Sequence, residues 1–425
     1  MRSIVRSAAF AGVVSRGAGM AGAFGLSVAI LRSMSASDAG LVLLVYTLIT
    51  VAATLARFGS DNLALREVSK TPAESGPLIR HAFTIAVLLT PAAVLLLIGA
   101  VLLRGVHADS AQLAAAAAAA VLPASLSVIA GAVLRGLSKV AAGTFAELGS
   151  PLLLAAGGIA VFGLTQNASA VTSVWIITAG YSATAIWSWA LIFRLVPDVR
   201  HRAKGFGAFC RKFRASLAAF FMTTLGFYLF SWMPVLALGY FIKDQSIAQS
   251  NVALFNAGSR ISQFIILIPT IQISYLSQQF ASLSHRGDLA TLNRTSQSAT
   301  RIAMLWAIPL TVAMLWMPRT ALSIFGDYTD AAASLQVLAI GALLVAALGP
   351  VNGLMLTCGH ERAAGRYTLV LLAVSAVCLP ILARWGSVGV AAGSAPIALM
   401  YATACYVTLS RNGIYAAIPR RHRDC

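Results

Sequence analysis

Long runs of apolar residues, separated by short polar connections, recur along the whole chain. Twelve of these runs approach or exceed the roughly 20 residues that a helix needs to cross a bilayer. The pattern therefore predicts an all-α, polytopic membrane protein. The twelve expected spans lie near residues 8–31, 39–56, 81–103, 113–134, 142–164, 172–193, 215–241, 252–276, 302–318, 334–356, 367–383 and 387–408.

The composition agrees with this pattern. Of the 425 residues, 59% are hydrophobic and 10% are charged, whereas soluble domains carry roughly 45–50% apolar and about 25% charged residues. A soluble enzyme, a secreted disulfide scaffold and a single-span receptor are therefore excluded. The six histidines and five cysteines show no metal-ligand spacing and no disulfide framework. We expect neither a metal nor a cofactor.

The basic residues predict the orientation of the spans, because Lys and Arg are retained on the cytoplasmic side. If the N-terminus is cytoplasmic, 24 of the 31 basic residues fall on its side of the membrane and five fall on the opposite side. Those five are Arg32, Arg104, Lys243, Arg319 and Arg384. The net charge of +18 is thus a topology signal, with attraction to anionic membrane lipids as a second effect. It does not indicate nucleic-acid binding, and both termini are expected in the cytoplasm.

The most basic connection lies near the middle of the chain, with six spans before it and six after it. Transporters built from internal repeats show this organisation. We therefore expect an N-terminal six-helix half at residues 1–200, a basic cytoplasmic linker at 201–214, and a C-terminal half at 215–425.

Four charged residues fall within or at the end of expected spans. Arg16 lies in the first span, Glu147 in the fifth and Arg260 in the eighth, and Arg57 ends the second. A charge at the bilayer centre costs at least about 2.5–3.5 kcal/mol and usually faces a cavity or a partner. Arg57 also has a simpler interpretation, as a residue that reaches the interface and sets topology.

Polar side chains accompany these arginines at helical spacing. Gly12 and Gly19 share a face with Arg16, and the two other rows are Thr47, Thr50, Thr54 and Arg57 in the second span, and Asn256, Arg260, Gln263, Thr270 and Ser274 in the eighth. Pro269 is expected to kink the eighth span. We predict that the three rows line a common water-filled cavity. Since the planar guanidinium fork suits phosphate, the cavity would favour an anionic substrate.

Other interpretations stay open at this point. Thr and Ser rows can serve only for hydrogen bonds between helices, and Glu147 can form a purely structural ion pair with an arginine. A drug or metabolite antiporter on the same fold is one alternative, and a multidrug exporter for organic cations would be expected to place acids and aromatic residues in such a cavity. A membrane polysaccharide polymerase would need a folded outer loop, and the longest outer loop here, near 319–333, is short. We expect no enzymatic activity.

Several segments, in their order along the chain, resemble the polysaccharide-biosynthesis flippases of the multidrug/oligosaccharidyl-lipid/polysaccharide superfamily. The resemblance covers nearly the whole chain. It is carried by the glycine-rich first span, by L-A-R-F-G-S-D-N-L-A-L-R-E at Leu55–Glu67, by F-N-A-G-S-R at Phe255–Arg260, by S-H-R-G-D-L at Ser284–Leu289 and by G-S-V-G-V-A-A at Gly386–Ala392.

The resemblance implies two six-helix bundles that form a V around a central cavity. It also implies a function: moving polyprenyl-pyrophosphate-linked oligosaccharides from the cytoplasmic to the outer leaflet of a bacterial inner membrane. Related lipid II flippases use cavity arginines on the first, second and eighth helices, and Arg16, Arg57 and Arg260 match those positions. Twelve spans instead of fourteen favour O-antigen, exopolysaccharide or capsule-type units.

From these residues we expect alternating access without covalent chemistry. Arg16, Arg57 and Arg260 would hold the pyrophosphate, Asn256, Gln263, Thr50 and Thr54 would contact sugars, and Glu147, or Asp61 in the following loop, would couple an ion. Expected partners are the lipid-linked oligosaccharide, membrane lipids, and the polymerase and glycosyltransferases of the same pathway.

Overall fold

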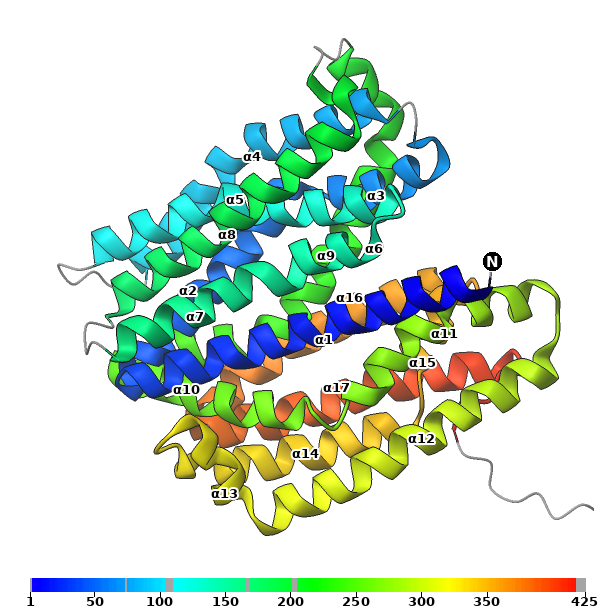
Figure 1. The fold of residues 1–425 in the computed structure, drawn as a ribbon. Coiled ribbons are helices and arrows are strands. Elements are labelled where there is room, and N and C mark those ends of the chain that lie inside the picture. The colour runs from blue at the N-terminus through cyan, green and yellow to red at the C-terminus, as the bar shows by residue number, and fades with distance from the viewer. Residues whose placement is uncertain (1, 73–74, 104–109, 165–168, 201–204, 418–425) are drawn as a thin grey trace, which may run out of the picture. The chain divides into compact units, whose positions relative to one another are not determined.

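The chain folds into helices joined by short turns (Figure 1). The computed structural model describes residues 2–72, 75–103, 110–164, 169–200 and 205–417. No strand occurs among these residues, so the prediction of an all-α polytopic protein is confirmed. The chain divides into two compact units, Met1–Leu229 and Phe230–Cys425, and the division falls within one long helix, α9 (Phe206–Phe241). The expected linker at 201–214 is therefore helical from Phe206 onward.

The first unit is arranged around α2. Its helices are α1 (Arg2–Ser33), α2 (Ala36–Arg57), α3 (Ser60–Lys70), α4 (Gly76–Leu103), α5 (Ser110–Gly136), α6 (Val140–Thr144), the π-helical η2 (Phe145–Gly149), α7 (Ser150–Leu164), α8 (Ala170–Leu195), the 3-10 turn η3 (Pro197–Arg200) and the first part of α9. Most residues of α2 are buried, and this helix packs against α4, α5 and α8. Helix α1 packs along α7 and η2.

The second unit contains the end of α9 and the remaining helices. These are α10 (Gln245–Ser262), α11 (Leu267–His285), α12 (Leu289–Trp316), α13 (Pro318–Leu322), α14 (Ala332–Ala347), α15 (Val351–Thr357), α16 (Glu361–Leu382) and α17 (Gly386–Arg411), with 3-10 turns η4 (Ser323–Phe325), η5 (Thr329–Ala331) and η6 (Ala383–Trp385). Helix α17 packs against α10, α14, α15 and α16 and so forms the centre of this unit.

The expected spans correspond to helices. Within the described residues, nine stretches are long and apolar enough to cross a membrane, and the bent pair α10–α11 makes ten. One of the nine, Glu361–Arg411, consists of the two mutually packed helices α16 and α17. Helix α1, 32 residues long, accounts for the expected span at 8–31. The run at 302–318 is the second half of α12, which begins earlier, at Leu289.

Side-chain caps fix the start of four helices. The Ser35 hydroxyl accepts a hydrogen bond from the Asp38 N–H at the start of α2, and Ser169 does the same at α8. Carboxylates of Asp244 and Asp288 cap α10 and α12 in the same way. A cap satisfies a backbone donor that the first turn of a helix leaves unpaired, so these polar residues determine where each apolar run becomes helical.

The eighth span is broken instead of gently kinked. Helices α10 and α11 meet at an angle of 63°, and the segment between them, 263–266, makes tight turns such as Ile265 N–H to Ser262 O. Pro269 lies in the first turn of α11, where its missing N–H is tolerated, whereas in a continuous helix its ring would clash with the preceding turn. The polar row predicted on one face of this span therefore lies on two differently directed helices.

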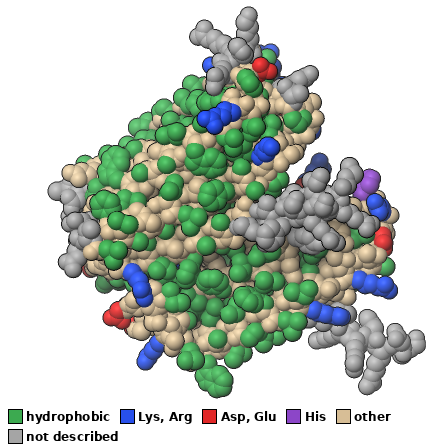
Figure 2. Space-filling model, in the orientation of Figure 1, with side chains coloured by type: hydrophobic (Ala, Val, Ile, Leu, Met, Phe, Trp, Pro, Cys, Tyr) green, Lys and Arg blue, Asp and Glu red, His purple; other side chains and the backbone are tan. Residues whose placement is uncertain are grey.

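Large apolar side chains cover much of the outside of the helices. Leu95 and Leu96 on α4 are 69% and 64% exposed, and Leu305 on α12 is 77% exposed. Figure 2 shows hydrophobic side chains across the face in view, with charged groups mostly toward its margins. An exposed apolar surface of this extent is the surface that a bilayer covers.

Candidate functional site

The turn between α2 and α3 brings a cluster of polar residues together in the first unit. Phe58 and Gly59 both have positive φ angles, 47° and 73°, and they redirect the chain from α2 into α3. A Cβ atom on Gly59 would lie 2.7 Å from the Leu217 carbonyl oxygen of α9. Phe58 stacks on Phe221 with ring centroids 4.5 Å apart. The turn is therefore held directly against α9.

Asp61 lies on α3 and is buried, which corrects the expectation that it belongs to a polar loop. The αL–αL turn allows α3 to begin at Ser60, and apolar Leu63 and Val68 pack the helix into the unit. Asn62 donates a hydrogen bond to Thr224 on α9, and Arg66 donates to Ser216. The segment Leu55–Glu67 is thus a structural element, a turn and a short helix along α9.

Arg57 is the best-buried charge of the described residues, with 3% of its surface exposed. Its Nη2 donates to the Thr54 hydroxyl at 2.8 Å, and its Nε lies 3.7 Å from Asp61 Oδ2. Both Arg57 Nε and Asp61 Oδ1 have no hydrogen-bond partner in the described protein. The guanidinium therefore has a carboxylate beside it, but its Nε–H keeps a hydrogen-bonding capacity that none of the described side chains uses.

The threonine hydroxyls of α2 are mostly hydrogen-bonded to the backbone of their own helix. The hydroxyls of Thr47, Thr50 and Thr54 each donate to the carbonyl oxygen four residues earlier. Thr54 in addition accepts from Arg57. Thr54 therefore orients the guanidinium, while Thr50, half-buried, keeps only acceptor capacity for another group.

Two tyrosines, Tyr181 and Tyr228, lie within electrostatic reach of Arg57, and a third, Tyr46, interacts with both of them. The Arg57 Cζ atom lies 5.8 Å from the centre of the Tyr228 ring on α9, within the range of a cation–π contact. Tyr46 of α2 and Tyr181 of α8 interact through their hydroxyl groups. Tyr228 lies within electrostatic reach of Asp61 and Glu147. The first unit therefore gathers a cation, two acids and aromatic hydroxyls in one region.

Glu147 has a definite partner. Its Oε2 lies 2.6 Å from Nη1 of Arg135, at the end of α5. Close helix packing permits this pair: a Cβ on Gly131 would lie 2.9 Å from the Glu147 Cβ, and one on Gly143 would lie 2.8 Å from the Arg135 backbone N. Glu147 also belongs to the π-turn η2, and such turns are frequent at functional sites.

The predicted residues of the second unit are organised differently. Arg260, half-buried, donates a hydrogen bond of 3.2 Å from Nη1 to Oε1 of the exposed Gln263. Asn256, one turn earlier on α10, is buried. The Ser274 side chain lies outside the described part of the chain. Arg260, Gln263 and Asn256 thus form a short group at the break between α10 and α11.

Arg16 lies on α1, and its side chain is outside the described residues. The glycine face of this helix is used for packing. A Cβ on Gly19 would lie 2.8 Å from the Leu148 Cβ, and one on Gly22 would lie 3.2 Å from the Leu152 Cβ. Gly19 and Gly22 therefore allow α7 and η2 to approach α1 closely and leave no room for a ligand at these two positions.

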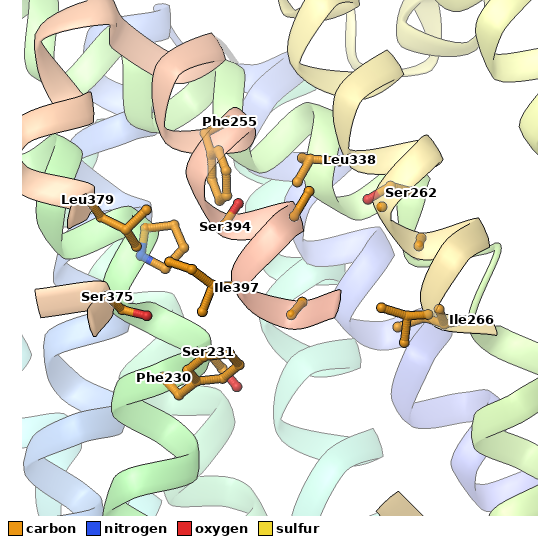
Figure 3. Close-up of a pocket in the computed structure, with 16 residues that line it drawn as sticks. Phe230, Ser231, Phe255, Ser262, Ile266, Leu338, Ser375, Leu379, Ser394 and Ile397 are labelled. Atoms are coloured by element: carbon orange, nitrogen blue, oxygen red, sulfur yellow. The ribbon is translucent and has the colours of Figure 1, made fainter. Parts of the chain in front are cut away.

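The second unit contains a hollow of about 240 Å³ between α9, α10, α14, α16 and α17 (Figure 3). Apolar side chains such as Phe255, Leu379 and Ile397 form most of its wall. The hydroxyls of Ser262, Ser375 and Ser394 donate to carbonyl oxygens of their own helices. None of the predicted site residues whose side chains the structure describes lines this hollow, so it suits an apolar group and does not suit a phosphate.

Arg135, Tyr181 and Tyr228 belong to the cluster but were not predicted from the sequence. Arg135 was assigned to a cytoplasmic connection, yet it and Glu147 flank the same tight turn at 137–139, and two helices joined by a short turn bring such residues together. Tyr181 and Tyr228 are polar aromatic residues within apolar spans. This position is a signal in the sequence that could have identified them as candidates.

The fold is that of known transporters. The structure is similar to an inward-facing multidrug resistance MATE family transporter of the MOP superfamily, with a TM-score of 0.69, 14% identity, and coverage of 95% of this chain and 98% of that one. The outward-facing form of such a transporter gives a TM-score of 0.64 at 14% identity, covering 96% and 95%. A MOP superfamily transporter from Pyrococcus furiosus, described by a reverse polarity of its binding pocket, gives 0.60 at 14% identity, covering 96% and 95%. The protein is therefore a multi-pass membrane protein with the fold of these transporters.

Within this class, the chain belongs to the polysaccharide biosynthesis protein family, whose model matches residues 9–278. No curated protein matches the sequence significantly. The family suggested by the sequence segments is therefore confirmed.

Proposed function

We propose that the protein moves an oligosaccharide linked to polyprenyl pyrophosphate from the cytoplasmic to the outer leaflet of a bacterial inner membrane, by alternating access and without covalent chemistry. The O-antigen, exopolysaccharide and capsule types of repeat unit are the proposed substrates. Family membership supports the polysaccharide pathway, and the fold supports transport.

The observation that carries the proposal is the state of Arg57. Its guanidinium is buried, is oriented by Thr54, and has an Nε atom to which no described group is hydrogen-bonded. Burying a charge without full hydrogen bonding costs several kcal/mol. A phosphate oxygen is an anionic acceptor that suits this fork, so binding of a pyrophosphate would repay part of that cost.

Asp61 has a complementary role in this proposal. At 3.7 Å from Arg57 Nε it is close enough to compensate the cation but too far for a strong hydrogen bond. A bound pyrophosphate would compete with Asp61 for the guanidinium. After release, Asp61 would again serve as counter-ion, so that the empty transporter does not return with an uncompensated buried charge.

Arg16 and Arg260 would complete the pyrophosphate site, with Asn256, Gln263, Thr50 and Thr54 contacting sugars. Glu147 and Asp61 are the two acids proposed for ion coupling. Replacing Glu147 by Gln tests this directly: normal transport under an ion gradient would remove Glu147 from the coupling mechanism.

A deletion strain tests the function. We expect loss of the gene to cause accumulation of a lipid-linked intermediate and loss of surface polysaccharide. Wild-type protein should restore the polysaccharide, while Arg16→Ala, Arg57→Ala and Arg260→Ala should not, at equal membrane levels. Arg411→Ala, an exposed arginine at the end of α17, is the matched control and should restore it. Full complementation by all three variants would overturn the proposed role of the arginines.

The proposed orientation has both termini in the cytoplasm, with membrane lipids, the polymerase and the glycosyltransferases of the pathway as partners. Single cysteines placed at Ser246 and at Ser284, in a chain without its native cysteines, test the orientation. An impermeant thiol reagent added to spheroplasts should label position 246 and not position 284.

A drug or metabolite antiporter on the same fold is the second candidate. The apolar hollow of the second unit favours it, since an organic molecule fits such walls better than a sugar does. Resistance profiling of the deletion strain separates the two candidates. Altered drug sensitivity with normal surface polysaccharide would favour the antiporter. A third candidate, a polysaccharide polymerase, would be revealed by chain elongation in vitro.

A further inference from the structure

A second hollow of the second unit lies at the ends of its helices. It has a volume of about 720 Å³ and is formed where the turn from α9 to α10 faces the turn from α16 to α17. Its wall contains two basic side chains, Lys243 from the first turn and Arg384 from the second. The proposed pyrophosphate site uses neither residue.

The two cations are unusual in their position. Lys243 and Arg384 are two of the five basic residues that the alternation of spans places on the side opposite the N-terminus. The positive-inside bias disfavours basic residues on that side. Both side chains are exposed, and neither forms a hydrogen bond or an ion pair with any described residue. The two turns nevertheless bring them to one concave surface.

Neither neighbouring polar group of the described residues, Asp244 or Asn251, is paired with these cations. The Asp244 carboxylate, next to Lys243, accepts hydrogen bonds from the Ile247 N–H and the Ser246 hydroxyl and so caps α10. Asn251 accepts from the Ser387 N–H at 2.7 Å and donates to the Ile247 carbonyl. Asn251 therefore braces the start of α17 against α10, which fixes the wall that carries Arg384 relative to the one that carries Lys243.

The remaining wall is apolar and outward-facing. Phe241, Ile247 and Ile381 are 61%, 53% and 48% exposed, and Trp385, beside Arg384, is 66% exposed. Tryptophan and basic residues at helix ends are typical of the membrane–water interface. Cations above an apolar wall at that depth match a lipid phosphate above its hydrocarbon chain, whereas a free phosphate would gain nothing from the apolar wall.

The apolar hollow of Figure 3 lies further along the same four helices. Phe241 and Pro234 on α9, seven residues apart, face the two hollows, as do Gly386 and Ser394 on α17. At 1.5 Å per residue, the seven residues on α9 correspond to about 10 Å and the eight residues on α17 to about 12 Å. The charged group of an amphiphile therefore matches the hollow with Lys243 and Arg384, and its apolar chain matches the hollow further along the same helices.

We propose that the hollow between the α9–α10 and α16–α17 turns binds the phosphate group of a membrane lipid, with Lys243 and Arg384 as its ligands. The site shares no residue with the Arg57 cluster. Its binding chemistry does not depend on which substrate is transported, so a failure of the proposed function would leave this inference standing.

The test measures lipid binding to full-length protein purified in detergent, by native mass spectrometry. The probes are farnesyl phosphate, phosphatidylglycerol, the uncharged alcohol farnesol, and inorganic phosphate. We expect at least one phosphate lipid to bind, with affinity falling about tenfold for each cation removed and more in the Lys243→Ala/Arg384→Ala double variant. Farnesol binding should not change. Preference for farnesyl phosphate identifies a polyprenyl lipid as the occupant, and preference for phosphatidylglycerol identifies a bilayer phospholipid.

Two controls make the result decisive. Arg319→Ala removes another exposed basic residue of the opposite-side set, on α13, which does not line the hollow, and should bind as wild type does. The exchange Lys243→Arg/Arg384→Lys keeps both charges and should retain binding. Unchanged phosphate-lipid binding in the double alanine variant, an equal loss in Arg319→Ala, or inorganic phosphate binding as tightly as either lipid would overturn the proposal.

Discussion

Arg135 and Glu147 form an ion pair across two helices of the first unit, with Nη1 and Oε2 2.6 Å apart. The pair joins the end of α5 to the π-turn η2, and the glycines between them allow the backbones to approach closely. Glu147, which the sequence places inside the membrane, therefore forms an ion pair with Arg135 of the same helical hairpin.

Replacing Glu147 by Gln should destabilise the protein, because Arg135 then keeps a partly buried charge without its counter-ion. Both side chains are partly exposed, 24% for Arg135 and 17% for Glu147, so the cost should fall below that of a fully buried pair, at about 1–3 kcal/mol. Arg135→Gln should cost a similar amount. The double variant should recover most of the loss, as thermal unfolding in detergent would show.

Transport assays on the same variants separate structure from coupling. If the pair is only structural, transport per folded molecule stays normal in all three variants. A loss of ion-gradient dependence in Glu147→Gln that the double variant does not restore would instead assign Glu147 to coupling. Additive single-variant costs would contradict the pair itself.

Arg57→Lys should lower lipid-linked oligosaccharide flipping about tenfold or more, while membrane levels stay normal. Lysine keeps the charge but is a single point donor. It cannot hold Thr54, face Asp61 and lie over Tyr228 together as the planar fork does. Flipping of a fluorescent lipid-linked substrate in proteoliposomes measures this. Wild-type rates in Arg57→Lys would show that only charge matters at this position.

Gly59→Ala should lower the free energy of unfolding more than a glycine-to-alanine substitution at another position with positive φ does. Gly59 has φ 73°, and its added Cβ would meet α9 backbone atoms at 2.7 Å. Gly287 is the matched control, with φ 71° and open space around its Cβ position. We expect about 1–2 kcal/mol for Gly287→Ala, from the backbone conformation alone. Gly59→Ala should exceed this, and equal losses in the melting temperature would disprove the close docking of the α2–α3 turn.

The stability of α3 should depend on acid pH through Glu67. Hydrogen bonds from Lys70, and then from Arg66, hold the pKa of the Glu67 carboxyl below its ordinary value of 4.5. A lowered pKa means that the pair stabilises the folded protein above pH 4.5 and that this contribution is lost as pH falls through the lowered pKa. The exposed basic side chains limit its size to about 1 kcal/mol or less.

The variant Glu67→Gln should therefore be less stable than wild type at neutral pH, with the difference vanishing as the pH falls below the lowered pKa. Melting temperatures measured between pH 3 and pH 7 would show the two curves converge. Glu361→Gln, at an exposed carboxylate that forms no ion pair in the described residues, is the matched control for removing one negative charge.

The spans could be predicted because each one depends only on a run of consecutive residues in the sequence. A run of apolar residues long enough to cross a bilayer must be helical, since only a helix satisfies its own backbone groups in lipid. The break between α10 and α11 was only partly predictable. Pro269 indicates a disturbance, but the 63° angle depends on how the two helices pack.

The charged residues were less predictable. Arg57 was recognised as a candidate, but Asp61 was assigned to a loop because the segment after α2 is polar. Its burial depends on Gly59 and on contacts with Leu217 and Phe221 of α9, more than 150 residues later. The sequence predicts Arg135 as a topology-setting cation. In the structure, Glu147 lies on the other side of the short turn at 137–139 and pairs with it.

The sequence by itself determined that the protein is helical, that it crosses a membrane many times and which family it belongs to, since apolar length and ordered motifs are properties of consecutive residues. Only the tertiary structure decided which charges meet. It pairs Arg135 with Glu147, sets Asp61 beside Arg57 and brings Lys243 near Arg384. Which side chains meet across two helices depends on how closely the helices pack, and one glycine or one turn changes which side chains face each other. A local sequence pattern does not contain this information.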